Sequence, residues 1–280
     1  MWTRGLASWY GGNGRHGLPW RQTRDPWAVL VSEVMLQQTQ VARVIPYWER
    51  FLTRWPDAAA FTRAPLADVL REWQGLGYPR RARNLWLAAA RIERDGWPRT
   101  EAALRALPGV GMYTARALLA LAFDATSAPP LDVNIARVAA RAALGAEPHA
   151  VSRRSIEAAI DGARPRNLGR REYTFALFDA GALHCRATPR CSGCPLSRGC
   201  VARSRSAVIS AARRRSQHYD GTMRQLRGAL LAASLKHKRP LTAESASAAA
   251  AHLQLGRDRS AVVAALDSLR RDGLIAPTDG

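Results

Sequence analysis

All four cysteines of this 280-residue chain fall within sixteen residues, so any fold must bring the thiols of one short segment close together. They follow the spacing C-x5-C-x2-C-x5-C and are Cys185, Cys191, Cys194 and Cys200. Four thiols so close in sequence can enclose one tetrahedral metal ion or a [4Fe–4S] cluster. All-cysteine zinc sites mostly contain two C-x2-C pairs, whereas this segment contains one. The spacing therefore favours a [4Fe–4S] cluster over zinc, and it favours either of them over unligated core cysteines.

Outside this segment the chain consists mainly of short helical patterns separated by proline and glycine, with few strand signals. The expected helices are Pro26–Thr39, Val41–Phe51, Pro65–Gln74, Arg81–Asp95, Thr100–Ala106, Gly111–Phe123, Val133–Leu144, Ser152–Gly162 and Glu172–Leu183. After a basic linker at 206–222, a tail at 223–280 adds helices over Met223–Leu235 and Asp258–Arg271, with a short helix between them. That order is typical of a winged-helix-like domain without its wing, or of a small helical cap that binds nothing. We therefore expect an all-α fold.

The chain is strongly basic, with 42 Lys and Arg residues against 22 Asp and Glu residues and a net charge of +20. A protein with this charge is expected to bind a polyanion, and nucleic acid is the polyanion that we expect. No apolar stretch reaches the length of a transmembrane helix, and the N-terminus lacks the continuous apolar segment of a signal peptide. We therefore expect a soluble, cytoplasmic and nucleoid-associated protein with no membrane partner.

A turn with two closely spaced glycines, Leu107-Pro108-Gly109-Val110-Gly111, lies between two of the expected helices. Glycines one residue apart allow backbone N–H groups to approach an anion beside the positive end of the following helix. A simple packing turn between two helices is the alternative. In so basic a chain the pattern favours a helix-hairpin-helix motif, which binds a DNA phosphate without reading the base sequence.

Two carboxylates stand out by their surroundings. Glu33 lies in the apolar run Ala28–Leu36, where it is either on a solvated polar stripe with Gln37 and Gln40 or buried with a raised pKa. Asp132 precedes an expected helix and, taken alone, is best interpreted as its N-cap. Glycosidic hydrolysis requires two carboxylates in different environments, one protonated as the acid and one ionised to stabilise an oxocarbenium-like sugar. A nucleobase flipped out of a duplex would then be the leaving group.

Several segments together resemble the MutY-type adenine DNA glycosylases, which belong to the helix-hairpin-helix base-excision superfamily. The segments are Leu18–Arg21, Ser32–Val41, Gly75–Tyr78, Leu107–Thr114, Leu131–Asn134 and the cysteine segment. The resemblance covers about residues 1–205 and implies a two-lobed all-α fold with DNA in the cleft between the lobes. It implies a six-helix lobe at 24–130, which holds the hairpin, and a cluster lobe made of 1–23 and 131–205.

The resemblance also implies roles for individual residues. Glu33 matches the general acid that protonates N7 of adenine, and Asp132 matches the carboxylate that stabilises the sugar cation. Tyr113 and Asn134 match residues that support this site. Gln38 and Tyr78 match residues that enter the helix near the orphan base. Further DNA contacts are expected from Gln37, Leu107, Gly109 and Gly111, a base pocket from Leu18, Trp20, Arg21 and Phe175, and cluster ligation from Cys185, Cys191, Cys194 and Cys200.

Three features of this chain depart from the family pattern. Cys185 and Cys191 are separated by five residues where the family usually has six. Phe175 occupies a position where the family often has a Gln or Glu that contacts adenine. The tail from Thr222 is unlike the C-terminal domain, similar to a nucleotide hydrolase, with which many bacterial members recognise 8-oxoguanine. The related endonuclease III group has a Schiff-base lysine at position 113, whereas this chain has no lysine before Lys236.

We therefore predict a monofunctional DNA N-glycosylase of base-excision repair, a hydrolase that releases adenine mispaired with 8-oxoguanine or guanine. Its expected cofactor is a [4Fe–4S] cluster, and its expected partner is double-stranded DNA that contains a mispair. We expect it to act as a monomer. The alternatives are a glycosylase of the same fold that acts on thymine or a damaged purine, and a zinc-containing DNA-binding regulator without enzymatic activity.

Overall fold

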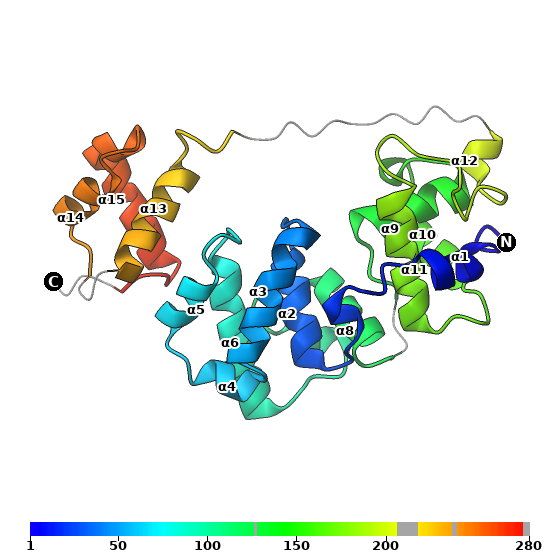
Figure 1. The fold of residues 1–280 in the computed structure, drawn as a ribbon, viewed down its shortest axis with the longest axis horizontal. Helices are drawn as coiled ribbons and strands as arrows, with labels where there is room; N and C mark the ends of the chain where they lie inside the picture. Colours follow the sequence, from blue (N-terminus) through cyan, green and yellow to red (C-terminus); the bar gives the residue numbers. More distant parts are fainter. Residues whose placement is uncertain (126–127, 206–217, 237–239, 277–280) are drawn as a thin grey trace. The chain divides into compact units, whose positions relative to one another are not determined.

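The computed structural model describes residues 1–125, 128–205, 218–236 and 240–276, and all of their regular elements are helices (Figure 1). The expected all-α fold is thus confirmed. In the described part of the chain no helix combines the length and the apolar character that crossing a membrane requires. Residues 206–217 of the expected linker and residues 277–280 of the expected tail lie outside the described residues.

The chain forms two compact units. The first comprises the described residues of Met1–Glu33 and Pro98–Arg213, and the second comprises those of Val34–Trp97 and Arg214–Gly280. The border falls within helix α2 (Pro26–Leu36), where almost every residue is buried. A helix that is apolar on all sides must be enclosed by protein, which explains why α2 lacks the polar stripe of a surface helix.

The first unit is organised around α11, which packs against three other helices of that unit. Figure 1 shows α1 beside α11, although more than 150 residues separate them in the sequence. Helices α8 and α9 pack against α11 as well. The helices of this unit are α1 (Leu6–Asn13), η1 (Pro19–Arg21), the start of α2, α7 (Glu101–Arg105), α8 (Met112–Leu121), α9 (Val133–Ala139), η2 (Ala140–Leu144), η3 (Pro148–Ala150), α10 (Arg153–Asp161), α11 (Arg170–Leu183) and α12 (Val201–Ser204).

The second unit joins α3 (Val41–Arg54), α4 (Ala58–Thr62), α5 (Leu66–Glu72) and α6 (Arg80–Asp95) to the helices of the tail. Buried aromatic rings hold the first group together, with the ring centroid of Phe51 5.1 Å from that of Phe61 and 4.7 Å from that of Trp55. Edge-on and tilted contacts of this kind stabilise a core beyond the area that they bury.

The tail contains three α-helices and one short 3-10 helix in its described residues. They are α13 (Met223–Lys236), α14 (Ala243–Ala250), η4 (Leu255–Arg257) and α15 (Arg259–Arg271). Leu230, Val262 and Leu269 are fully buried between them, and α13 also packs against α5. No strand follows α15 as far as residue 276, where the described part ends.

Most expected helices are found within two or three residues of their predicted ends, but one difference matters for the site. The helix predicted over Pro26–Thr39 ends at Leu36. Gln37 and Gln40 therefore cannot form a polar helical stripe with Glu33, and that interpretation of Glu33 is wrong. The backbone leaves the helical region at Gln38, whose φ is 58°, and the Arg81 guanidinium binds backbone carbonyl groups at the end of α2.

Candidate active site

Glu33 is buried in α2, with 6% of its surface exposed. Burial is the main influence on the carboxyl group and raises its pKa from 4.5 to about 7. A hydrogen bond from the Tyr113 hydroxyl lowers this pKa, and the nearby negative charge of Asp132 raises it. Glu33 thus meets the requirement for a carboxylic acid that still carries its proton near neutral pH.

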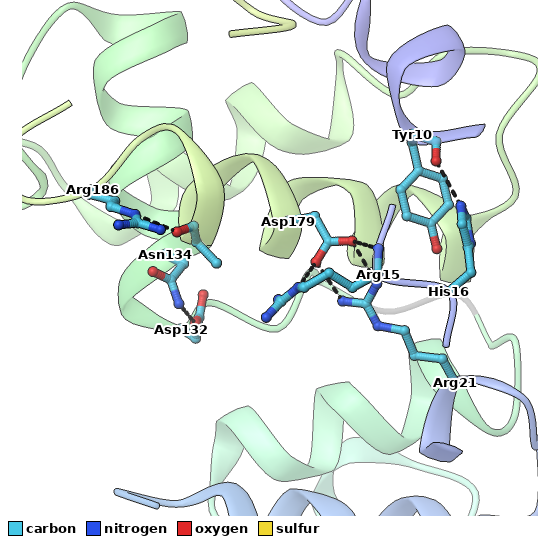
Figure 2. Close-up of polar contacts among 9 residues, drawn as sticks. Tyr10, Arg15, His16, Arg21, Asp132, Asn134, Asp179 and Arg186 are labelled. Atoms are coloured by element: carbon cyan, nitrogen blue, oxygen red, sulfur yellow. Dashed lines mark hydrogen bonds and ion pairs between the residues drawn. The ribbon is translucent and has the colours of Figure 1, made fainter. Parts of the chain in front are cut away.

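Asp132 is the N-cap of α9, as its sequence position predicts. One carboxylate oxygen accepts a hydrogen bond from the Ile135 N–H at 2.6 Å, and the other accepts one from the Asn134 side-chain amide at 2.8 Å (Figure 2). Burial raises the pKa of Asp132, and these two donors counteract that shift because they stabilise the ionised form. The site therefore holds two carboxyl groups with different surroundings.

Tyr113 links the carboxyl groups to the glycine turn. It lies in the first turn of α8, two residues after Gly111, the N-cap of that helix. Burial raises the pKa of its hydroxyl well above 10.0, and the charges of Glu33 and Asp132 raise it further. A tyrosine in this state remains a hydrogen-bond donor and does not act as a base.

The turn before α8 has the geometry that its sequence predicts for a helix-hairpin-helix. Gly109 has a φ of 76°, a left-handed conformation that glycine adopts without steric cost. Leu107 is buried at 6% exposure and anchors the turn, while Gly111 begins α8 with extended backbone. The helix that follows directs its unpaired N–H groups towards the turn, which is the arrangement that binds an anion.

A close approach of α9 and α11 positions Asn134. A Cβ atom on Gly181 would lie 2.7 Å from the Cβ atom of Asn134 and 3.1 Å from its carbonyl oxygen. Only a glycine at 181 lets the helices approach this closely. Arg137 on α9 connects this helix to the segment that follows α11. Its guanidinium donates to the Asn134 side-chain oxygen at 2.7 Å and to the Cys185 carbonyl oxygen at 2.5 Å. The cysteine segment is thereby connected through Asn134 to Asp132.

Arg21, one of the expected base-pocket residues, binds a buried aspartate, Asp179, on α11 (Figure 2). Arg21 donates to both of its carboxylate oxygens, at 2.7 and 2.8 Å, and Arg15 donates through its backbone N–H at 2.9 Å. Burial opposes ionisation of Asp179, but the hydrogen bonds and charge of Arg21 hold its pKa below the usual value. The Arg21 guanidinium also lies 4.4 Å from the ring centroid of Phe175.

The structure gives the surroundings of all four residues that the sequence predicts for the base pocket. Leu18 is the N-cap of η1, Trp20 is 6% exposed, Arg21 is bound to Asp179, and Phe175 is 5% exposed beneath Arg21. Of these residues, Arg21 and Phe175 are in contact with each other, and Arg21 ties η1 to α11 within the first unit.

The four cysteines line a single cavity of about 40 Å³. Arg141, only 2% exposed, donates towards the Cys185 sulfur at 3.9 Å and accepts from the Cys200 thiol through its carbonyl oxygen at 3.9 Å. Within the described residues, no three His, Cys, Asp or Glu side chains gather closely enough to hold a metal ion. The four thiols thus share one small cavity, which also has Arg141 in its lining.

In the second unit Arg81 organises the two segments that carry Gln38 and Tyr78. Its guanidinium makes hydrogen bonds of 2.7–3.3 Å, and burial lowers its pKa to about 10. The acceptors are the carbonyl oxygens of Val34, Met35, Gln37, Leu76 and Gly77 and the hydroxyl oxygen of Thr39. Gln38 and Tyr78 have positive φ values of 58° and 48°, which are strained for these residue types. Arg81 fixes the turns in which this strain is held.

Sequence reasoning missed four residues that hold the site together, namely Arg81, Arg137, Arg141 and Asp179. Asp179 and Arg141 had a signal, since each is a charged residue within an otherwise apolar helical run. Arg137, four residues before Arg141 in the same run, had the same signal, whereas Arg81 had none, because most of its acceptors are backbone carbonyl groups, which every residue possesses.

Comparison with known proteins places this geometry in a family. Residues 31–159 match the HhH-GPD superfamily of base excision DNA repair proteins. The adenine DNA glycosylase of Mycolicibacterium smegmatis is 41% identical over 278 residues, which are 98% of this chain and 92% of that protein. The adenine DNA glycosylase of Mycobacterium tuberculosis is 40% identical over 98% of this chain and 90% of its own length. The Homo sapiens adenine DNA glycosylase is 39% identical over 71% of this chain and 39% of its own length.

Solved structures agree with the fold. A thermostable thymine-DNA glycosylase superposes with a TM-score of 0.63 at 25% identity, over 72% of this chain and 95% of that one. A non-covalent endonuclease III–DNA complex gives a TM-score of 0.59 at 23% identity, over 73% of this chain and 94% of that one, which shows a common fold.

The contact between α9 and α11 gives a first prediction. Gly181→Ala should lower the free energy of unfolding by about 1–3 kcal/mol, because the new methyl group overlaps Asn134. Gly11→Ala is the matched control: Gly11 is also helical, and its added Cβ would meet no atom within 4 Å. That variant should be neutral or stabilised by about 0.5–1 kcal/mol. Urea denaturation measures both, and an equal change in the two variants would contradict the close approach.

Proposed function

The chain belongs to the HhH-GPD superfamily of base-excision DNA repair proteins, and from this membership we propose that it is an adenine DNA glycosylase. The reaction is hydrolysis of the N-glycosidic bond between adenine and deoxyribose in double-stranded DNA. The substrate we propose is adenine mispaired with 8-oxoguanine or guanine. The observation that carries this function is the buried Glu33 carboxyl, whose pKa is raised to about 7 beside Tyr113 and Asp132.

Departure of adenine requires a proton, because the anion of the base is a poor leaving group. Glu33 supplies it to N7 of the flipped base, since burial keeps a large share of its carboxyl groups protonated near pH 7. The hydrogen bond with Tyr113 orients the carboxyl group. Adenine release should therefore be fast below pH 7 and should fall as the pH rises through the pKa of Glu33.

Positive charge develops on the sugar as the glycosidic bond breaks, and Asp132 stabilises it. The Ile135 N–H and the Asn134 amide hold the carboxylate in place and favour its ionised form. The negative charge of Asp132 in turn raises the pKa of Glu33, so the ionised group helps to keep its partner protonated. A water molecule then completes the hydrolysis at the sugar carbon.

DNA is held without reading its sequence by the turn from Leu107 to Gly111 at the start of α8. Its glycines and the N–H groups of α8 suit one phosphate of the backbone. Gln37, Gln38 and Tyr78 are proposed to contact the duplex near the orphan base, and the exposed ring of Tyr78 is suited to act as a wedge.

Position 113 supports hydrolysis without strand cleavage. A Schiff base requires an amine, and the residue beside Glu33 and Asp132 is a tyrosine with a strongly raised pKa. The enzyme is therefore monofunctional.

We further propose that Cys185, Cys191, Cys194 and Cys200 hold a [4Fe–4S] cluster. A shared cavity lined by four thiols, with Arg141 directed at Cys185, supports the cluster. The bound cluster would supply a rigid cross-link of the segment between α11 and α12, and redox chemistry where an electron partner exists.

An alternative with the same fold is a thymine glycosylase, because the solved structure that matches at 25% identity is a thymine-DNA glycosylase. Adenine is favoured because the relatives at 40–41% identity over 98% of this chain are adenine DNA glycosylases. The repair family also makes a regulator without enzymatic activity the weaker interpretation.

Glu33→Gln should reduce the single-turnover rate of adenine release by about 10²–10⁴-fold, because the amide cannot donate the proton. Binding to the mispaired duplex should remain, since the amide has nearly the same shape. Glu49→Gln, exposed on α3, is the matched control and should release adenine at the normal rate. Oligonucleotides with adenine opposite 8-oxoguanine, guanine and thymine measure both release and opposite-base preference. Normal turnover by Glu33→Gln would exclude Glu33 as the acid.

The cluster proposal predicts a brown protein that contains iron and sulfide in equal amounts. Cys194→Ser should lose iron and the broad visible absorption, whereas Ser192→Ala, an exposed change in the same segment, should retain both. Metal analysis that finds stoichiometric zinc in a colourless protein would refute the cluster and support the zinc alternative.

A further inference from the structure

The tail is fixed to the helices of its own unit by specific polar contacts. Arg71 on α5 donates to the Leu235 carbonyl oxygen at the end of α13, at 3.1 and 3.0 Å. After α15, Gly273 approaches so closely that a Cβ atom there would lie 2.6 Å from the Arg83 guanidinium on α6. Its φ of +61° is a conformation that favours glycine. The tail is therefore held on α5 and α6 at two separate points.

A cleft with a volume of about 580 Å³ lies between the tail and the segment before α6. It is lined by Gly77, Tyr78, Pro79, Arg80, Tyr219, Arg224, Arg227, Gly228 and Asp272. One wall comes from the Tyr78 segment and the other from α13, the residues before it and the end of α15. Neither the proposed hydrolysis nor the proposed cluster uses this cleft.

The cleft is positively charged, with three guanidinium groups against one carboxylate among its described lining residues. Asp272 pairs with Arg227 at 2.5 Å and lies 3.6 Å from Arg80, so it neutralises part of the charge. Arg224 is exposed and has no carboxylate within ion-pair distance among those same lining residues. The remaining charge is complementary to phosphate groups.

Two tyrosines with exposed rings face this charge. Tyr78 is 44% exposed and Tyr219 is 49% exposed, and they come from opposite walls. Arg224 connects them, because its guanidinium donates to the Tyr78 hydroxyl at 3.3 Å and lies 5.5 Å from the ring centroid of Tyr219. Gly228 makes room for Tyr219 on α13, since a Cβ atom there would lie 3.1 Å from the tyrosine hydroxyl.

Exposed aromatic rings interleaved with guanidinium groups bind unstacked nucleotides, through base stacking and phosphate contacts. We propose that this cleft binds one nucleotide of the DNA strand next to the mispair, with its base on Tyr219 and its phosphate on Arg224. The inference rests on the proposed function, because Tyr78 brings the cleft to the DNA only if Tyr78 enters the duplex. The tail thereby adds a second, sequence-independent contact with the substrate.

The cleft contributes affinity and not base identity. Stacking on Tyr219 and a phosphate contact with Arg224 are open to every nucleotide, because each base has a π-face and each nucleotide a phosphate. A phosphorylated peptide would satisfy the arginines but would leave the two tyrosine rings without stacking partners. DNA therefore fits the observations better than a protein ligand.

The test measures binding by the full chain in a Glu33→Gln background, so that the probe survives. The probe is a fluorescein-labelled duplex with one adenine–8-oxoguanine mispair, measured by anisotropy over a range of salt concentrations.

Arg224→Met should weaken binding about tenfold and reduce the slope of log K against log salt by about 1. Tyr219→Leu should weaken binding about tenfold without changing the slope, because it removes stacking and no charge. Arg259→Met, exposed on α15 and outside the cleft lining, is the matched control and should change affinity less than about twofold.

A cross-linking arm locates the contact. Duplexes with 5-iododeoxyuridine at successive positions beside the mispair should cross-link on irradiation to the peptide that contains Tyr219. Unchanged affinity and slope in Arg224→Met, with cross-links only elsewhere, would overturn the cleft proposal and leave a protein ligand as its occupant. If the wild-type chain binds the duplex through Arg224 but releases no adenine, the glycosylase proposal is refuted and the cleft proposal is not.

Discussion

Ionising a carboxyl group that is buried away from water costs free energy, and the proposed hydrolysis depends on this cost at Glu33. A pKa raised from 4.5 to about 7 corresponds to a penalty on the order of 3 kcal/mol for the charged form. The apolar run around Glu33 on α2 creates that penalty, and the nearby charge of Asp132 adds to it. Hydrogen bonding by Tyr113 reduces the penalty without removing it. An acid poised near neutral pH and an ionised neighbour are the two groups that glycosidic hydrolysis requires.

The remaining architecture serves to hold these groups in place. Asp132 is fixed as a helix cap, and its partner Asn134 is placed by the close approach of α9 to Gly181. Arg137 connects Asn134 to the carbonyl group of Cys185, so a cluster in the cysteine segment would stiffen the same element that carries Asp132. Buried guanidinium groups recur in these roles because one planar group can satisfy several carbonyl oxygens at once. Arg21, Arg81, Arg137 and Arg141 thus use their positive charge within the fold.

Helices and motif residues could be predicted from the sequence because their signals are local. Proline and glycine mark the helix ends, and the position before a helix marks Asp132 as a cap. The apolar run around Glu33 left both a solvated polar stripe and burial open, and the structure shows burial. The long-range partners could not be predicted. Arg21 and Asp179 are 158 residues apart, and Arg81 and Val34 are 47 apart, with nothing in either segment that names the other. The helix α2 ends at Leu36, three residues before its predicted end, where Gln38 takes a positive φ and Arg81, from outside the helix, binds the last carbonyl groups. The roles of the site residues, and the lobe boundaries implied by the resemblance, remain predictions.

The protonation of Glu33 can be measured directly by carbon-13 NMR of the chain labelled at its glutamate side-chain carboxyl carbons, with the Glu33→Gln variant assigning the signal. We expect a titration midpoint at about pH 7 for this one resonance. Asp132→Asn should move the midpoint downwards, because the charge of Asp132 contributes to the shift. A Glu33 resonance that titrates near the ordinary value of 4.5 would exclude the proposed mechanism, since the group would then be ionised at neutral pH and unable to act as the acid.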